Sequence, residues 1–195
     1  MSAALLLTLS RIILGPVFIA IYLYYGEMGI SLSVLPYVLI ALTAFSELSD
    51  LFDGLLARKR NQVTELGKLL DPLADSIFRL SVFLAFTQGF VKLPLLLVAV
   101  FFYRDSLIST LRTICALRGV ALAARLSGKV KAVIQGVIAF FILILMIPYS
   151  MGYMSLDMLQ TLSFYSVLVG AIYTLFSGVE YLYVNRPFIR KAIKP

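Results

Sequence analysis

The chain is a succession of long apolar stretches separated by short polar connections. Each stretch is close to the ~20 mostly apolar residues that a helix needs to cross a bilayer. The predicted helices cover about residues 9–25, 34–57, 67–88, 93–116, 130–149 and 158–183. The preceding segment MSAALLLT is predicted to form a short N-terminal interfacial helix. The pattern therefore predicts an all-α integral membrane protein with six transmembrane helices in a single domain, residues 1–195.

Composition agrees with this pattern and removes several function classes. Apolar residues make up 61% of the 195 residues, and the mean hydropathy is +0.98, whereas a soluble domain would carry far more polar surface. The sequence contains no histidine, which excludes histidine metal ligands and Ser-His-Asp triads. Its single cysteine, Cys115, cannot form an internal disulfide.

Basic residues are distributed unequally between the two sets of connections. Thirteen Lys and Arg residues lie in the 58–68 and 117–131 connections, in the C-terminal tail and at Arg11, whereas the opposite connections carry only Lys92. By the positive-inside rule, both termini and both basic connections face the cytoplasm. The net charge of +7 then reflects topology and attraction to anionic lipid headgroups, and no nucleic-acid partner is expected.

Carboxylates interrupt the apolar pattern on the second and third predicted helices. Asp50 and Asp53 are three residues apart, and Asp71 and Asp75 are four apart, so each pair shares one helix face. Each carboxylate costs ~2.5–3.5 kcal/mol near the middle of a membrane, and like charges close together repel. Two divalent cations would relieve both penalties, since Mg²⁺ prefers oxygen ligands and keeps positions open for substrate phosphates.

Other interpretations of the acidic residues remain open. They could pair with basic neighbours, and Asp75 and Arg79 have the spacing of an i,i+4 ion pair. A cation transporter could use carboxylates as an ion path, although no internal repeat typical of transporters is visible. Intramembrane prenyltransferases also use Asp-rich helices, but with two motifs far apart in a longer chain.

The segment DLFDGLLARKRNQVTELGKLLDPLAD fits the pattern D-x2-D-G-x2-A-R-x8-G-x3-D-x3-D at every fixed position. This pattern resembles the signature of the CDP-alcohol phosphotransferase family. The segments TLSRIILGPVF, YRDSLISTLR and LSGKVKAVIQ are similar to the corresponding parts of its phosphatidylglycerophosphate synthase branch. The resemblance covers most of the chain and leaves only the last predicted helix generic.

The resemblance implies an enzyme that transfers the phosphatidyl group of CDP-diacylglycerol to a small alcohol and releases CMP. It implies two Mg²⁺ or Mn²⁺ ions per site, a homodimer, and an active site that faces the cytoplasm at a bacterial cytoplasmic membrane. The implied metal ligands are Asp50, Asp53, Asp71 and Asp75, of which Asp75 is also the general base. The implied nucleotide-binding residues are Asp50, Gly54, Ala57, Arg58 and Gly67.

The identity of the acceptor depends on four basic residues. Arg104 and Arg112 lie eight residues apart in the fourth predicted helix, and Lys129 and Lys131 lie at the start of the fifth. Arg104 could pair with Asp105 or a site aspartate while the lysines act as membrane anchors. We expect instead that the four bind the phosphate of glycerol 3-phosphate, because arginine and lysine both suit phosphate. The expected acceptor is then glycerol 3-phosphate, and the expected product is phosphatidylglycerophosphate. In the phosphatidylglycerophosphate synthase branch, which this chain resembles, the matching basic positions are expected to bind glycerol 3-phosphate.

One departure keeps other acceptors open. The phosphatidylglycerophosphate synthase branch commonly has Lys after the fourth aspartate, where this chain has Ser76. Phosphatidylglycerol (giving cardiolipin), inositol phosphate, serine or a choline-type substrate are the alternative acceptors within the family.

Overall fold

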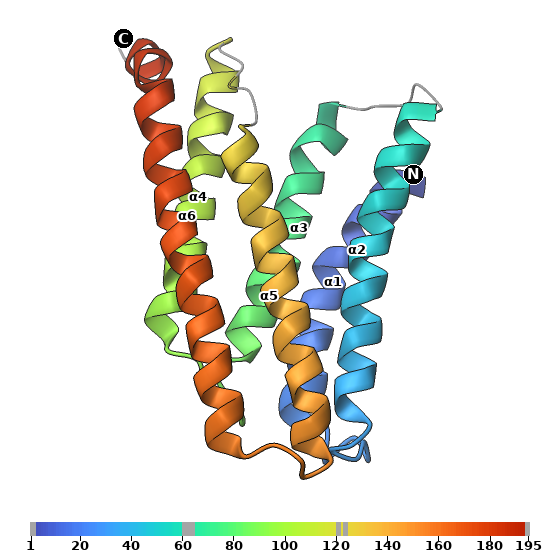
Figure 1. Ribbon diagram of the computed structural model, residues 1–195. Helices are drawn as coiled ribbons and strands as arrows, with labels where there is room; N and C mark the ends of the chain where they lie inside the picture. The colour runs from blue at the N-terminus through green and yellow to red at the C-terminus, as the bar shows by residue number, and fades with distance from the viewer. Residues whose placement is uncertain (1–2, 60–64, 120–121, 123–124, 194–195) are drawn as a thin grey trace.

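The described part of the chain is entirely helical. The computed structural model describes residues 3–59, 65–119, 122 and 125–193, with side chains at 9–49, 73–119, 122 and 125–189. Figure 1 shows its six helices in one bundle. They are α1 (Ala3–Tyr24), α2 (Leu35–Lys59), α3 (Glu65–Ala85), α4 (Leu95–Leu117), α5 (Leu126–Ser150) and α6 (Leu156–Ile193).

The helix bounds follow local backbone signals. Pro94 caps the start of α4 in an extended conformation, and Gly119 and Gly152 follow α4 and α5 with φ of +72° and +78°, a region that glycine enters without strain. The separate N-terminal interfacial helix is not observed, because residues 3–8 continue directly into α1. α6 extends well past the predicted end at residue 183, and Pro187 lies within it.

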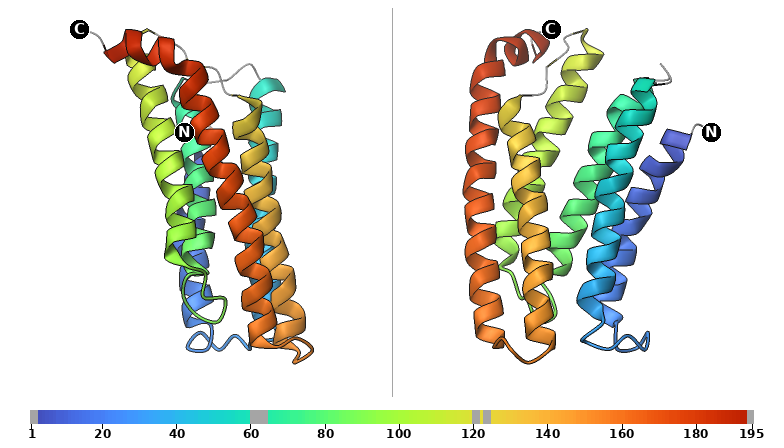
Figure 2. Two further views of the ribbon diagram at one scale, coloured as in Figure 1. Left: turned by 60° about the vertical axis from the view of Figure 1, so that its left-hand side comes forward. Right: turned by 45° about the vertical axis from the view of Figure 1, so that its right-hand side comes forward.

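Packing in the bundle does not follow chain order. α1 packs against both α2 and α3, and α2 and α3 make much less contact with each other than α1 makes with either. α6 packs against both α4 and α5, which do not pack directly within the described residues (Figure 2). Although the connection between them is short, α4 and α5 are therefore not neighbours along their length. Connection length limits the distance between helix ends but not which long faces meet.

The alternating helix directions gather the basic segments at one end. The C-terminal ends of α2, α4 and α6 and the N-terminal ends of α3 and α5 lie at the same end of the bundle (Figure 1). Residues that approach these ends from different helices can therefore share one site.

An aromatic cluster fixes α1 against α3. The rings of Phe18 and Phe78, and of Tyr22 and Phe86, meet edge to face, with centroids 6.3 and 5.5 Å apart. The Tyr22 hydroxyl donates to the carbonyl of Gln88 at 3.2 Å. Such contacts hold aromatic pairs in specific orientations, and they set the register that brings polar residues of α1 and α3 together closer to the basic end.

The outer faces of the later helices are apolar. Leu96 of α4, Val169 of α6 and Phe176 of α6 are 81, 63 and 61% exposed. Among the described residues, Leu126–Ser150 and Leu156–Ile189 are long and apolar enough to cross a membrane, and Leu9–Tyr24 and Leu35–Ser49 form shorter apolar helices. Large exposed apolar surfaces of this kind are typical of proteins in contact with lipid.

Candidate functional site

Asp75 is held by arginines from two helices. Its Oδ1 accepts a hydrogen bond from Nη1 of Arg11 in α1 at 3.1 Å, and its Oδ2 accepts one from Nη2 of Arg79 at 2.6 Å. The second contact is the i,i+4 ion pair that the spacing allowed. Arg11 is fully buried, so it is not the surface anchor that a count of cytoplasmic charges suggests.

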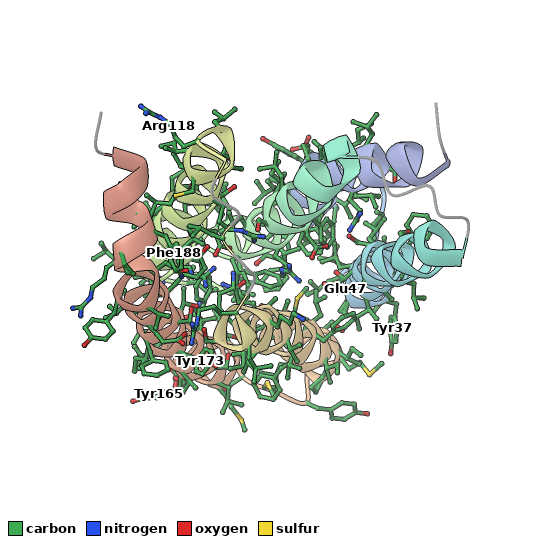
Figure 3. All side chains as sticks on the ribbon, turned by 90° about the horizontal axis from the view of Figure 1, so that it is seen from above. Tyr37, Glu47, Arg118, Tyr165, Tyr173 and Phe188 are labelled. Carbon is green, nitrogen blue, oxygen red and sulfur yellow. The ribbon has the colours of Figure 1, made fainter. Side chains whose placement is uncertain are left out.

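Glu47 extends the charged group to α2. Its Oε1 lies 3.8 Å from Nη1 of Arg79, and Figure 3 shows Glu47 on the side of α2 that faces the middle of the bundle, whereas Tyr37 points outward. Arg79 thus lies between carboxylates of α2 and α3. The sequence singled out neither Glu47 nor the burial of Arg11, although each is a charged residue in an apolar stretch, which usually has a polar partner.

A cavity of about 720 Å³ lies beside these charges. One part of its wall is charged, formed by Glu47, Asp75, Arg79 and Lys129. The remainder follows α5 and is apolar, formed by Ala132, Val133, Gly136, Val137, Phe140, Phe141 and Ile144. The residues of the apolar wall recur mostly at spacings of three and four, so they lie along one face of α5 over about three turns. The cavity therefore suits a molecule with a charged head and an apolar tail.

Two of the four predicted phosphate-binding residues converge on Asp105. Nζ of Lys131 lies 2.7 Å from both carboxylate oxygens of Asp105, and Nη1 of Arg104 lies 3.0 Å from Oδ1. All three side chains are at most 12% exposed. Nε of Arg104 is buried without a hydrogen-bond partner. A carboxylate thus balances part of the charge of Arg104 and Lys131, as the alternative interpretation of Arg104 allowed.

Lys129 and Arg112 have different surroundings. Lys129 is exposed and lines the same cavity as Asp75, so its ammonium is available to an anion there. Arg112 is half-buried and is not among the residues that line this cavity. In the part of the chain with described side chains, neither residue forms an ion pair.

Most residues of the sequence motif lie outside the described side chains. These are Asp50, Asp53, Gly54, Ala57, Arg58, Gly67 and Asp71. Their backbone belongs to the C-terminal half of α2 and the N-terminal half of α3, the halves that lead to the same end of the bundle. Where side chains are described, no three acidic or cysteine residues cluster as a metal site would require, so of the four predicted metal ligands only Asp75 has a described environment.

A further ion pair, which the sequence did not indicate, joins the start of α5 to α6. Oε1 of Glu180 accepts a hydrogen bond from Nε of Arg125 at 2.8 Å and lies 2.7 Å from its Nη2, and Oε2 accepts from the hydroxyl of Ser127. The sequence signal for this pair was Glu180 itself, an acidic residue within the last predicted helix, which is otherwise apolar.

Comparison with known proteins agrees with the motif. The family model for CDP-alcohol phosphatidyltransferase matches residues 1–176. A CDP-diacylglycerol–glycerol-3-phosphate 3-phosphatidyltransferase of Bacillus subtilis is 30% identical over 92% of this chain and 92% of its own. A protein of the same name from Rickettsia typhi is 32% identical over 90% of this chain and 92% of its own. One from Aquifex aeolicus is 43% identical over 42% of this chain and 41% of its own.

Proposed function

Since the chain belongs to the CDP-alcohol phosphatidyltransferase family, we propose that it transfers the phosphatidyl group of CDP-diacylglycerol to glycerol 3-phosphate. The products are phosphatidylglycerophosphate and CMP. Several relatives that share about nine-tenths of their length with this chain carry the name of this activity, which supports this acceptor over the alternatives.

The observation that carries the proposal is the two-part cavity. Its charged wall contains Asp75 and Lys129, and its apolar wall follows α5 as far as Ile144. CDP-diacylglycerol is charged at its pyrophosphate and apolar along its acyl chains. In the proposed complex, the reacting phosphate lies at the charged wall and the acyl chains extend along α5.

Divalent-metal dependence is general in this family. We assign the metal ligands to Asp50, Asp53, Asp71 and Asp75, and the ions to Mg²⁺ or Mn²⁺, two per site. The donor set fits, because carboxylate oxygens are the ligands that these hard cations prefer, and Asp75 offers one at the cavity. When bound, such ions would stabilise the negative charge that develops as CMP leaves. We assign nucleotide binding to Asp50, Gly54, Ala57, Arg58 and Gly67.

The protein's own side chains supply proton transfer and positioning. Asp75 is the proposed general base, which takes the proton from the acceptor hydroxyl as it attacks the phosphate. Both of its oxygens accept from guanidinium groups, so Arg11 and Arg79 fix its direction, and one must move aside for the proton. Lys129 supplies a positive charge on the same wall for the acceptor phosphate.

The acceptor phosphate site is proposed to include Arg104, Arg112, Lys129 and Lys131. Lys129 is the most accessible residue of this site. Asp105 neutralises part of the positive charge that Arg104 and Lys131 bring to it. Replacing Arg112 with Ala should raise the KM for glycerol 3-phosphate and leave that for CDP-diacylglycerol nearly unchanged. A silent Arg112→Ala variant would remove this residue from the site. The test is sharp because Arg112 does not line the cavity.

The proposed membrane arrangement has six spans with both termini in the cytoplasm of a bacterium. It rests on the positive-inside rule and on the gathering of the basic helix ends at one end of the bundle. The active site then faces the cytoplasm at the cytoplasmic membrane, and the enzyme works as a homodimer.

The experiment that tests the function is CMP release by the purified protein with CDP-diacylglycerol and Mg²⁺. The acceptors are glycerol 3-phosphate, glycerol, inositol phosphate, serine and phosphatidylglycerol, and the lipid product is identified by mass spectrometry. We expect glycerol 3-phosphate to give the highest kcat/KM. A higher kcat/KM with another acceptor would contradict the choice of glycerol 3-phosphate but would not affect the assignment to the family.

A further inference from the structure

The start of α5 lacks the usual local stabilisation of a helix N-terminus. Arg125 occupies the N-cap position but makes no side-chain capping hydrogen bond, and the first turn of α5 contains no acidic residue. A helix N-terminus carries partial positive charge and favours a nearby negative group. At this end of α5 the adjacent Arg125 adds a further positive charge.

Glu180 of α6 supplies the missing negative charge from outside the helix. One of its oxygens binds the guanidinium of Arg125, and the other binds the hydroxyl of Ser127. The carboxylate is 25% exposed, so solvent screens the pair only in part. A residue before the helix and a residue of its first turn are thereby fixed to α6.

A short path of bonds connects Glu180 to Lys129. The backbone N–H of Lys129 donates to the carbonyl of Arg125 at 3.3 Å, and the side chain of Lys129 lines the cavity that contains Asp75. The Arg125 side chain is fixed by Glu180, while its carbonyl accepts this hydrogen bond of α5. Displacement of Arg125 would therefore change the position of Lys129.

The same segment of α6 also limits Arg104. A Cβ atom on Gly178 would lie 3.1 Å from Cγ of Arg104, and one on Gly128 of α5 would lie 3.4 Å from its Nη2. Arg104 thus lies in a narrow space between α5 and α6 that glycine on each side leaves open. Gly178 is two residues from Glu180, so one segment of α6 lies against Arg104 and also binds Arg125 and Ser127, which flank the start of α5 just before Lys129.

We propose that residues 178–180 of α6 position the acceptor phosphate site, with Glu180 fixing the start of α5 and Gly178 admitting Arg104. The inference rests on the proposed function, since it concerns the acceptor of that reaction. These residues lie beyond the match to the family model, which ends at residue 176, so that match assigns them no role. Glu180 acts through Arg125 and Lys129 and is a positioning residue.

The test is the kinetics of Glu180→Gln in the full-length protein, with CMP release measured against each substrate separately. We expect the KM for glycerol 3-phosphate to rise about five- to tenfold, with the KM for CDP-diacylglycerol and kcat changed less than about twofold. Asp157→Asn, an exposed acid at the opposite end of α6, is the matched control and should behave as wild type. Equal changes in both KM values, or no change, would overturn the proposal.

Two further measurements keep the test decisive. If Glu180→Gln does not fold, Arg125→Gln breaks the same ion pair from its more exposed side and must give the same selective rise in KM. Amide hydrogen exchange should increase at residues 126–131 in either variant and stay unchanged at residues 157–162. Exchange that does not increase, or that increases without a selective rise in KM, overturns the positioning role. If the wild type releases no CMP with glycerol 3-phosphate, the proposed function fails, and the exchange result still reports on the ion pair.

Discussion

Nζ of Lys131 in α5 lies 2.7 Å from both carboxylate oxygens of Asp105 in α4, although these two helices do not pack directly within the described residues. The long lysine side chain crosses the space beside α6 to reach the acid. Both side chains are at most 8% exposed. The pair therefore joins helices that the rest of the packing leaves apart, in the interior of the bundle.

Asp105→Asn should destabilise the protein. The substitution leaves the Lys131 charge buried without its full partner, and breaking a buried ion pair in this way costs about 3–5 kcal/mol. The free energy of unfolding, measured by denaturant titration in detergent, should fall by that amount. Adding Lys131→Met to the same chain should recover part of the loss, because the buried charge is then removed as well. Equal stability of Asp105→Asn and wild type would contradict the ion pair.

Asp75→Asn should reduce kcat by at least about a hundredfold, since general-base catalysis contributes roughly 10²–10⁴-fold. Binding of CDP-diacylglycerol in the presence of metal, followed by calorimetry, should change little. Asp71→Asn, at a proposed metal ligand without the role of base, should instead weaken metal-dependent binding of the donor. If donor binding disappears in Asp75→Asn, the loss of metal-dependent binding alone accounts for the lost activity, and the role of Asp75 as base is contradicted.

The apolar wall of the cavity can be tested at Gly136 of α5. A Cβ atom there would lie 3.9 Å from Oε1 of Glu47, which is ordinary contact, so Gly136→Ala should leave the kinetics nearly unchanged. Gly136→Leu narrows the cavity and should raise the KM for CDP-diacylglycerol about tenfold, because the larger side chain competes with bound apolar groups for the same space. The KM for glycerol 3-phosphate is the internal control. A larger effect on that KM would place the donor elsewhere.

The proposed orientation predicts which lysines a membrane-impermeant amine reagent reaches. Lys129, which is exposed, should be labelled only from the cytoplasmic side, and Lys92 only from the outside. Lys131 is 4% exposed and should stay unlabelled from both sides, which makes it a control for unfolding. Labelling of Lys92 from the cytoplasmic side would contradict the proposed topology and would place the active site on the opposite side of the membrane.

Local sequence signals predicted the helices well. The predicted ranges 34–57 and 93–116 differ from α2 and α4 by at most two residues at either end. α4 lies between Pro94 and Gly119, whose backbone preferences are local, and the apolar run of α2 ends at the charged residues Arg58 and Lys59. α6 was predicted too short. Its extension to Ile193 continues through charged residues after the apolar run ends, which a hydropathy pattern does not register.

Long-range pairing was less accessible from the sequence. The i,i+4 pair of Asp75 with Arg79 could be anticipated from spacing, but the contact of Asp75 with Arg11 depends on α1 packing along α3, 64 residues away. Glu180 and Arg125 are 55 residues apart and meet for the same kind of reason. A charged residue inside an apolar stretch usually has a polar partner. Which residue that partner is depends on the tertiary arrangement.

The most direct test of the central claim is a single reaction of the purified protein with CDP-diacylglycerol and glycerol 3-phosphate. With Mg²⁺ or Mn²⁺ present, we predict release of CMP in equal amount to a new lipid whose mass is that of phosphatidylglycerophosphate, and loss of both products when a chelator removes the metal. Asp75→Asn, purified in parallel, should give neither product above background. CMP release without this lipid would contradict the acceptor, and turnover that is undiminished in chelator would contradict the metal-dependent mechanism built on Asp75.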